Sequence, residues 1–270
     1  GEMRHSFDDF PAIEYDGYRA YANLPPCGAM RGHGAVTVRH AFEVLLDRMA
    51  RELGLDPFEA RRKNLLHAPM RTANDLMVNS YGLAECLDAI EKASGWRERI
   101  GKLPPGKGLG MACSHYVSGA AKPIHWTGEP HATINVKVDF DGGITALTGA
   151  ADIGQGSSTM VAIAVADTLG VPIERVRVIA ADSAITPKDN GAYSSRITYM
   201  VGNAAIDAAK NLKTLLIGAA ARKLEARPED VITEHGTFRV GHGGQSVLAF
   251  EEVVREALVD EGTITVKGTF

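Results

Sequence analysis

The amino-acid sequence predicts an α+β fold in which mixed sheets pack against helices. Polar and apolar residues alternate from Thr133 to Phe140, and a period of two indicates a half-buried strand. In the segment that follows Val36, apolar residues recur at spacings of three and four, and this period indicates an amphipathic helix. Strands and helices do not alternate strictly along the chain, which favours α+β over a doubly wound α/β sheet.

The first hundred residues predict three helices. The apolar pattern after Val36 predicts a helix that Gly54 ends. Asp56 followed by proline predicts the N-cap and first position of a second helix, which we expect to reach about Leu66. A third helix is expected near residues 83–96, where leucine and isoleucine share one face.

Residues 101–109, with the sequence GKLPPGKGL, are the strongest linker candidate because they are dense in proline and glycine. Beyond them the dominant period changes from that of a helix to that of a strand. We therefore expect two domains, over residues 1–100 and 105–270.

The second of these domains begins with the clearest hairpin in the chain. Residues 133–140 and 144–147 flank an Asp-Gly-Gly turn, which is typical of two antiparallel strands. The remaining elements expected here are a helix over 157–169, a strand over 176–180, a long helix over 197–224 and a helix near 250–258.

Composition excludes several classes of protein. The chain of 270 residues has a formal net charge of −4, which gives no reason to expect nucleic acid or an anionic membrane as partner. We expect no membrane span and no export signal, because no apolar stretch approaches the roughly 20 residues that a bilayer requires. Cys27, Cys86 and Cys113 are too few and too widely spaced for a disulfide framework, and they favour a cytoplasmic protein.

Three glycine-rich segments precede helices and are the candidate binding loops. The first contains Gly154-Gln155-Gly156, followed by two serines. A helix N-terminus carries unpaired N–H groups that attract anions, and the two glycines would let a ligand approach bare backbone. A simple turn with an N-cap is the alternative interpretation.

The second candidate loop runs over residues 187–205 and is rich in small and hydroxyl side chains. Arg196 falls in the first turn of the helix that follows, where its charge opposes the helix dipole unless an anion is bound there. The alternative is a surface capping loop. The third candidate loop, residues 27–39, contains Arg31-Gly32-His33-Gly34, and His33 is either a base, a ligand-facing side chain or an ordinary polar loop residue.

No self-contained catalytic motif accompanies these loops. The sequence contains no nucleophile elbow, Walker loop, H-E-x-x-H or G-x-G-x-x-G. Its nine histidines form no i,i+4 pair and no cluster with cysteine, so we expect no metal held by protein side chains. Glycine-rich loops without catalytic side chains predict a cradle for a large anionic cofactor that carries the chemistry itself.

Taken together, the three loops resemble those of the molybdenum-binding subunit in the xanthine oxidase family of molybdenum hydroxylases. The family's Phe-Arg-Gly-x-Gly loop is matched by residues 30–34, its Gly-Gln-Gly by residues 154–156, and its Ser-Arg loop by Ser195 and Arg196 ahead of Gly-Asn-Ala at 202–204. The resemblance implies the molybdenum-cofactor-binding fold of xanthine oxidase type. Residues 1–100 would end the first such domain, and residues 105–270 would begin the second.

Carried over residue by residue, the resemblance implies twelve cofactor-binding positions. They are Arg31, Gly32, His33, Gly34, Gly154, Gln155, Gly156, Ala192, Tyr193, Ser194, Ser195 and Arg196. His33 stands where xanthine oxidases have a phenylalanine that stacks on substrate, so the sequence departs from the family there. The implied cofactor is molybdenum held in the dithiolene of molybdopterin cytosine dinucleotide. The resemblance also implies partner subunits that carry FAD and iron–sulfur clusters. Together with this subunit they would form a heterotrimer, which can itself dimerise.

Within this family, four stretches resemble the large subunits of 4-hydroxybenzoyl-CoA reductases: residues 125–145, 149–160, 182–196 and 262–270. That resemblance implies an aromatic acyl-CoA substrate and removal of its phenolic hydroxyl in anaerobic aromatic degradation. Two alternatives remain open: a molybdenum hydroxylase acting on an N-heterocycle or aldehyde, and a cofactor-free, non-catalytic binding module.

The two ends of the sequence predict a fragment of a longer polypeptide. The chain opens on Gly-Glu without an initiator methionine and closes on a strand-like run. The family's catalytic glutamate is expected beyond Phe270, so no catalytic residue is expected within the chain and the chain alone is expected to be inactive.

Overall fold

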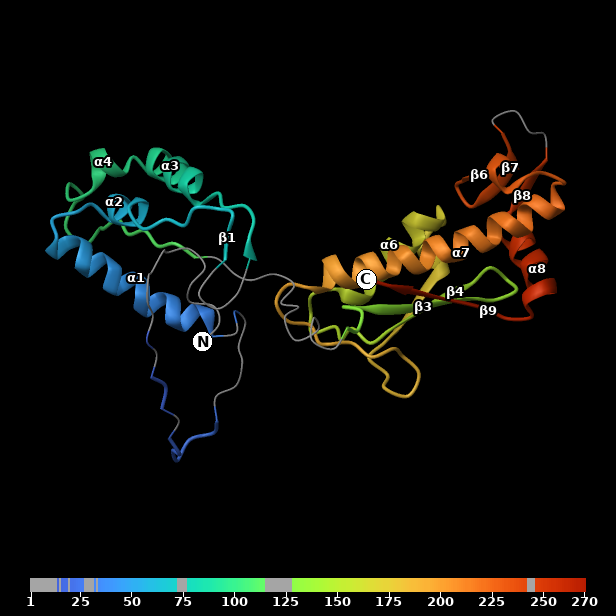
Figure 1. Ribbon diagram of the computed structural model, residues 1–270, viewed down its shortest axis with the longest axis horizontal. Coiled ribbons are helices and arrows are strands. Elements are labelled where there is room, and N and C mark those ends of the chain that lie inside the picture. Colours follow the sequence, from blue (N-terminus) through green and yellow to red (C-terminus); the bar gives the residue numbers. More distant parts are fainter. Residues whose placement is uncertain are drawn as a thin grey trace. The chain divides into compact units, whose positions relative to one another are not determined.

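The chain folds into two compact units, residues 1–117 and 118–270. The computed structural model describes residues 14, 16–18, 20–26, 32, 34–71, 77–114, 128–241 and 246–270 (Figure 1). The linker expected at residues 101–109 precedes this division of the chain.

Helices dominate the described part of the first unit. Its elements are α1 (Ala35–Glu52), α2 (Pro57–Arg62), the antiparallel pair β1 (Met70–Arg71) and β2 (Met77–Val78), α3 (Leu83–Ser94) and α4 (Trp96–Arg99). The three predicted helices are present, and α1 ends just before Gly54 as expected. Helix α2 ends at Arg62 instead of Leu66, because the side-chain amide of Asn64 donates to the carbonyl oxygen of Ala60 and closes the last turn.

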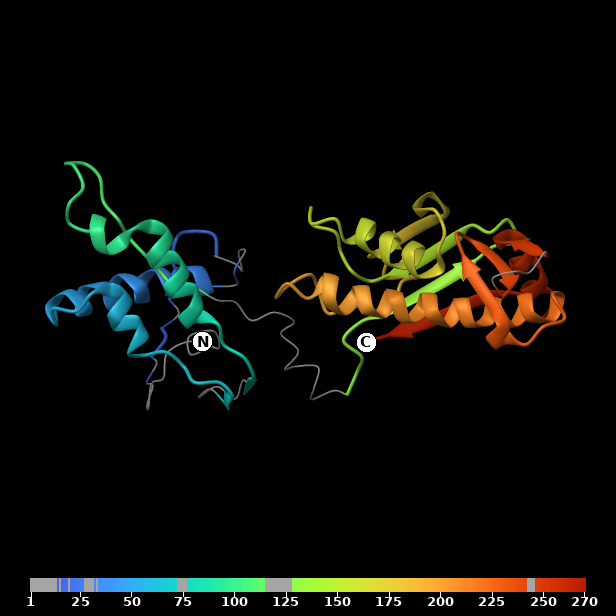
Figure 2. The ribbon, with the colours of Figure 1, turned by 90° about the horizontal axis from the view of Figure 1, so that it is seen from above.

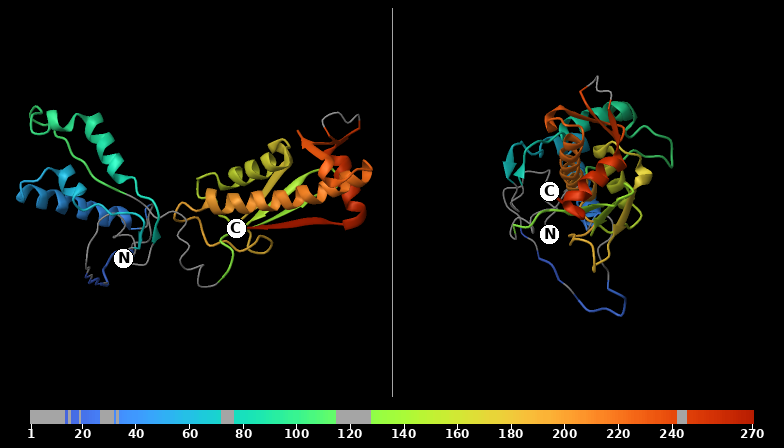
Figure 3. Two further views of the ribbon diagram at one scale, coloured as in Figure 1. Left: turned by 45° about the horizontal axis from the view of Figure 1, so that its top comes forward. Right: turned by 90° about the vertical axis from the view of Figure 1, so that its right-hand side faces the viewer.

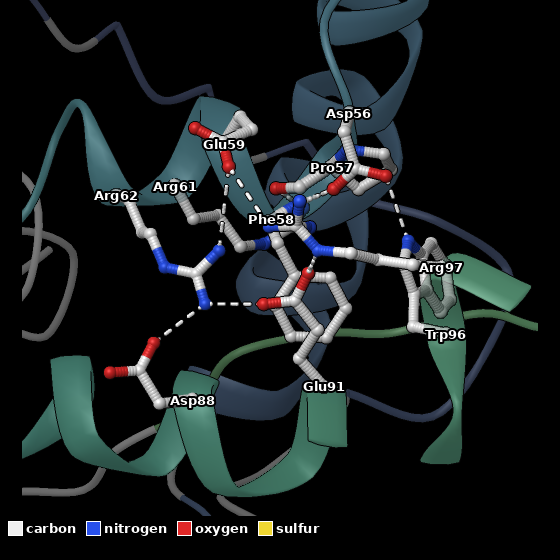
Figure 4. A network of polar contacts seen from close by, with 10 residues as sticks. All are labelled: Asp56, Pro57, Phe58, Glu59, Arg61, Arg62, Asp88, Glu91, Trp96 and Arg97. Atoms are coloured by element: carbon white, nitrogen blue, oxygen red, sulfur yellow. Dashed lines mark hydrogen bonds and ion pairs between the residues drawn. The ribbon is translucent and has the colours of Figure 1, made fainter.

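Asp56 connects the start of α2 with α4 (Figure 4). One carboxylate oxygen accepts from the backbone N–H of Phe58 at 2.8 Å, as the N-cap prediction required, and the other accepts from Trp96 Nε1 at 2.7 Å. The rings of Phe58 and Trp96 meet edge to face with centroids 5.1 Å apart. Together with Leu87 and Cys113, these rings form the small core of the unit.

An arginine–carboxylate network joins α2, α3 and α4 over this core (Figure 4). Arg62 donates to Asp88 at 2.7 Å and to Glu91 at 2.6 Å, and Arg97 donates to the other oxygen of Glu91 at 2.7 Å. These hydrogen bonds, that from Arg62 first, lower the pKa of Glu91. Three short helices are thus held together by charged as well as apolar contacts.

The buried face of α1 is polar in the middle. Glu43 is 5% exposed, and one of its oxygens accepts from Arg61 Nε at 3.0 Å and from the backbone N–H of Cys113 at 2.8 Å. Of the apolar side chains that predicted this helix, Phe42 and Leu46 are partly buried, whereas four are exposed: Val38, Leu45, Met49 and Leu53. The periodicity therefore predicted the helix, while a buried ion pair fixes which side of it faces the rest of the unit.

The second unit is built on a four-stranded sheet in the order β5-β4-β3-β9. Its strands are β3 (Thr133–Val138), β4 (Ile144–Thr148), β5 (Val176–Ala180) and β9 (Ile264–Thr269). The predicted hairpin is confirmed, since β3 and β4 pair antiparallel with Val138 opposite Ile144. Strand β9 pairs antiparallel with the other edge of β3, whereas β5 runs parallel to β4.

Helices α6 (Ser157–Leu169) and α7 (Gly202–Lys223) pack side by side against one face of this sheet (Figure 2). Both ends of α6 and the strand β5 lie where the sequence predicted them. The long helix expected over 197–224 begins with a π-helical turn, η2 (Ile197–Val201). Small residues such as Ala204 and Ala208 let α7 approach so closely that a Cβ on Gly268 would lie within 3.0 Å of its backbone.

The far end of α7 carries a second, three-stranded sheet (Figure 3). Its elements are the 3-10 turn η3 (Pro228–Asp230), β6 (Val231–Glu234), β7 (Thr237–Val240) and β8 (Val247–Ala249), followed by α8 (Phe250–Glu261). A further 3-10 turn, η1 (Ile173–Arg175), precedes β5. In the described ranges, no helix combines the length and the apolar character that crossing a membrane requires.

Candidate functional site

Two of the three candidate loops leave the same edge of the four-stranded sheet. The first loop, residues 149–156, follows β4, and the second loop, residues 181–196, follows β5. Because β4 and β5 are parallel, their carboxyl ends lie together. The backbone N–H of Ala181 still donates to the carbonyl oxygen of Thr148 at 2.9 Å, so the loops separate only after this bond.

Direct backbone contact keeps the two loops together beyond that point. A Cβ placed on Gly149 would lie 2.8 Å from the backbone nitrogen of Asp189 and 2.9 Å from its Cβ, and closer still to the carbonyl oxygen of Pro187. Real Cβ atoms essentially never approach so closely. Glycine at this position is therefore a requirement of the loop pairing.

The Gly-Gln-Gly motif presents bare backbone to open space. Gly154 and Gly156 have φ angles of 104° and 79°, and a Cβ added to either would meet nothing within 4 Å. Gln155 is exposed, yet its amide bonds to its own loop: the oxygen accepts from Ile153 N–H at 2.7 Å and the nitrogen donates to Ser157 Oγ at 2.6 Å. The side chain thus shapes the loop while its backbone stays accessible.

Asp152 supplies the anion at the N-terminus of α6. Its carboxylate accepts from the backbone N–H groups of Gly154 at 2.9 Å, Gly156 at 3.3 Å and Ser158 at 3.5 Å. The bond from Gly154 is the largest cause of a lowered pKa at Asp152. The sequence predicts an external phosphate or other anion at this helix end and does not single out Asp152. An aspartate two residues before a glycine is nevertheless a familiar turn signal.

Backbone strain is concentrated in the second loop. Ser194 and Ser195 both have left-handed backbone conformations, with φ angles of 54° and 51°. For a residue with a Cβ this conformation costs about 1–2 kcal/mol. Ser194 is buried whereas Ser195 is exposed, and strain of this kind tends to gather where a loop must hold a functional shape.

Arg196, which follows these serines, is almost fully buried at 1% exposure. Its Nη1 donates to the two carboxylate oxygens of Asp189 at 3.0 and 3.2 Å and to the carbonyl oxygen of Gly191 at 3.1 Å. Its Nη2 donates to the carbonyl oxygen of His131. An internal carboxylate thus lies beside this cation at the helix start, while binding of an external anion or cofactor by the loop stays a prediction.

The first residues before β3 and the end of β9 complete this edge of the sheet. The backbone N–H of His131 donates to the carbonyl oxygen of Phe270 at 2.6 Å, and the rings of Tyr199 and Phe270 meet edge to face at 5.2 Å. Through the His131 carbonyl, Arg196 is thus connected to the segment before β3 and, through His131, to the end of β9.

The third candidate loop belongs to the first unit, and among the residues that precede α1 in it only Gly32 and Gly34 are described. Gly32 and Gly34 have φ angles of 94° and 79° and lead into α1. Arg31 and His33 lie outside the described residues. Convergence of this loop with the other two stays a prediction.

Protein side chains offer no metal site in the described ranges, where no three His, Cys, Asp or Glu residues come together to hold an ion. Open glycine backbone and the exposed Gln155 and Ser195 fit a large organic ligand instead. Because Asp152 already occupies the amides of the first loop, that loop fits an uncharged part of such a ligand better than a phosphate.

Comparison with protein families gives two matches to the same description, molybdopterin cofactor-binding domain, over residues 88–270 and 3–65. The chain belongs to this family. The predicted fold is thereby confirmed as the molybdenum-cofactor-binding fold of the xanthine oxidase family, and the predicted molybdopterin cofactor is confirmed at the level of its pterin.

Similar proteins are molybdenum oxidoreductases and their subunits. A putative xanthine dehydrogenase molybdenum-binding subunit of Escherichia coli is 39% identical over 78% of this chain and 28% of its own length. The nicotine 6-hydroxylase large subunit of Paenarthrobacter nicotinovorans is 30% identical over 91% of the chain and 31% of its own length. Quinoline 2-oxidoreductase from Pseudomonas putida 86 superposes with a TM-score of 0.71 at 29% identity, covering 91% of this chain and 34% of that one.

The chain thus spans about a third of the length of these relatives. It holds the Gly-Gln-Gly loop and the Ser-Arg loop of the molybdopterin-binding domain at one edge of a sheet.

Proposed function

We propose that this chain is part of the molybdenum-binding subunit of an oxidoreductase that hydroxylates an N-heterocyclic or aldehyde substrate. Three relatives support the substrate class, since they are named for xanthine, nicotine and quinoline, which are all N-heterocycles. An aldehyde oxidoreductase from Desulfovibrio desulfuricans has the same fold, with a TM-score of 0.63 at 23% identity.

The observation that carries the proposal is the paired-loop edge of the second unit. Backbone at Gly154 and Gly156 lies open beside a second loop whose exposed Ser195 is held in a strained conformation. Backbone polar groups and small hydroxyls can orient a pterin without competing for its metal. Gln155 and Asp152 would then hold the first loop in shape from within.

The charge of Asp152 and the family resemblance together suggest which part of the cofactor each loop would contact. The first loop would border the uncharged pterin, because the Asp152 carboxylate repels a phosphate. Within the second loop, residues 192–196 would line the molybdenum or nucleotide side. The loop at residues 31–34 would border the molybdenum and the substrate channel.

When bound, molybdopterin cytosine dinucleotide supplies a molybdenum centre that exchanges two electrons with the substrate. Hydroxylation of a C–H bond takes its oxygen from water and releases two protons and two electrons. Partner subunits with FAD and iron–sulfur clusters would accept those electrons. This chain's residues would bind and orient the cofactor.

A second candidate, removal of the phenolic hydroxyl of 4-hydroxybenzoyl-CoA, is favoured by four stretches of the sequence, of which residues 149–160 and 182–196 form the paired loops. That reaction consumes two electrons and two protons and releases water, so it runs opposite to hydroxylation. The relatives reported above support the hydroxylase more directly.

One experiment separates these activities. The full-length subunit, purified with its native partners, is assayed with quinoline, an aromatic aldehyde and 4-hydroxybenzoyl-CoA, each with an electron acceptor and with a reduced donor. Acceptor-dependent hydroxylation of quinoline or the aldehyde supports the leading proposal, whereas donor-dependent formation of benzoyl-CoA replaces it with the second. Near-stoichiometric molybdenum in the complex excludes a non-catalytic, cofactor-free module.

A further inference from the structure

We propose that Arg196 and Asp189 are positioning residues of the cofactor site, and that Arg196 holds the second loop in shape without touching the cofactor. This inference rests on the proposed function, because it concerns how the loop is made ready for the pterin. It reassigns Arg196 from a ligand-binding to a positioning residue, and it adds Asp189, which no sequence motif singled out.

Burial is the first part of the argument. The side chain of Arg196 has an exposed fraction of 0% and that of Asp189 an exposed fraction of 5%. Both Nη atoms of Arg196 already donate to acceptors of the protein, on Asp189, Gly191 and His131. The third donor, Arg196 Nε, has no hydrogen-bond partner but is itself buried, so a cofactor phosphate could reach this guanidinium only if the loop opened.

Connectivity is the second part. The Asp189 carboxylate accepts from Arg196 and, at 2.7 Å, from the backbone N–H of Gly191. The backbone of Asp189 is packed against Gly149, the first residue of the other loop. The ion pair therefore joins the second loop to the first loop and, through the His131 carbonyl, to the segment before β3.

Strain is the third part. Ser194 and Ser195 directly precede Arg196, and both are in the left-handed region that residues with a Cβ avoid. Such a conformation persists only where its surroundings determine it. Because a buried charge must stay beside its partner, the Arg196–Asp189 pair anchors the end of this strained turn and keeps Ser195 exposed.

The contacts that the second loop makes with the cofactor then come from its exposed residues. Tyr193 is 37% exposed and Ser195 is exposed, whereas Ser194 and Arg196 are buried. Variants at Arg196 and Asp189 should thus both weaken cofactor binding by disturbing the shape of the loop. A variant at Ser195 should instead remove a direct contact with the cofactor.

The test is a double-variant cycle in the full-length complex, using Arg196→Met, Asp189→Asn and the two combined. Each single variant is expected to release molybdopterin about tenfold faster than the wild type, and the double variant no faster than the faster single one. Losses that multiply to about a hundredfold, or an effect of Arg196→Met without one of Asp189→Asn, would show that Arg196 contacts the cofactor itself and would overturn the proposal.

Hydrogen exchange of the amides of residues 193–197 gives a readout that does not depend on the cofactor. Exchange there should rise at least tenfold in Arg196→Met and in Asp189→Asn, and stay unchanged in the matched control Ser195→Ala, which nevertheless releases cofactor faster. Unchanged exchange in both Arg196→Met and Asp189→Asn overturns the proposal. Arg196→Lys serves as a second variant should Arg196→Met fail to fold, because it keeps the buried charge. Its exchange is expected to be intermediate, since one ammonium does not reproduce the fork geometry of a guanidinium. Exchange as slow as that of the wild type in Arg196→Lys also overturns the proposal.

The two proposals fail in different ways. A wild-type complex that contains no molybdenum refutes the proposed function, while the exchange measurement still decides whether Arg196 and Asp189 hold the loop.

Discussion

Gly268 offers the sharpest test of how the second unit is packed. It lies in β9 opposite Ile134, and a Cβ at this position would fall 2.7 Å from Ala208 Cα and closer still to two further backbone atoms of α7. Backbone atoms cannot rotate away, so Gly268→Ala must push α7 from the sheet by about 1 Å before carbon atoms regain ordinary separations. Ala204 and Ala208 are fully buried there, and forcing an extra methyl group into such a core costs about 1–3 kcal/mol. We expect a loss of about 3 kcal/mol in the free energy of unfolding.

Gly218→Ala is the matched control, because it makes the same chemical change within α7 where space is available. The nearest atom to a Cβ there is Arg222 Nη1 at 3.9 Å, and alanine in a helix interior is favoured over glycine by about 0.5–1 kcal/mol. Hydrogen exchange of the β3 and β9 amides reports the opening free energy of this sheet in both variants. A change of less than about 0.5 kcal/mol in Gly268→Ala would refute the packing argument.

Three further predictions concern single contacts. Arg61→Met leaves Glu43 buried without its partner and should destabilise the first unit by about 3–5 kcal/mol in urea unfolding. Trp96→Phe keeps the ring but removes the bond to Asp56, and we expect a loss of about 1 kcal/mol in the same assay. An NMR titration of Asp152 should give a pKa below that of a free aspartate; since the folded pKa is the lower one, its stabilising effect is present above about pH 4 and is lost as the pH falls through the folded pKa.

Each of these predictions has its own control. Adding Glu43→Gln to Arg61→Met should recover much of the loss, and a single Arg61→Met variant as stable as the wild type contradicts the buried-pair argument. Trp96→Phe is compared with Asp56→Asn, which keeps the cap oxygen. An Asp152 carboxyl that titrates like a free aspartate would mean that the three amides do not hold it.

The α6 helix shows what local sequence predicts well. Helix α6 begins at Ser157 and is capped at its C-terminus by Gly170, and the residues that predict both ends lie within a few positions of them. Strand β5 and the β3–β4 hairpin are likewise predicted by short stretches of sequence. Helix α1 marks the limit. Its period predicted a helix, but most of its apolar stripe is exposed and Glu43 is buried, because a partner 18 residues away, Arg61, decides which side faces inward.

Arg196 shows the same division within the site. The sequence correctly indicated that a cation at a helix start needs an anion, yet it could not say that Asp189 provides it or that the His131 carbonyl, 65 residues away, also accepts from the guanidinium. The Asp152 carboxylate likewise lies at the helix end where the sequence predicts an external anion.

By itself, the sequence determined most of the longer helices, the β3–β4 hairpin, strand β5, the glycine-rich loops and the resemblance to the family, because each depends on residue order over short distances. Only the tertiary structure decided that β5 lies parallel to β4, that their loops touch at Gly149, and that Arg196 is buried rather than open to a ligand. Those features depend on contacts between distant parts of the chain, where burial and close approach, and not local propensity, set the energy.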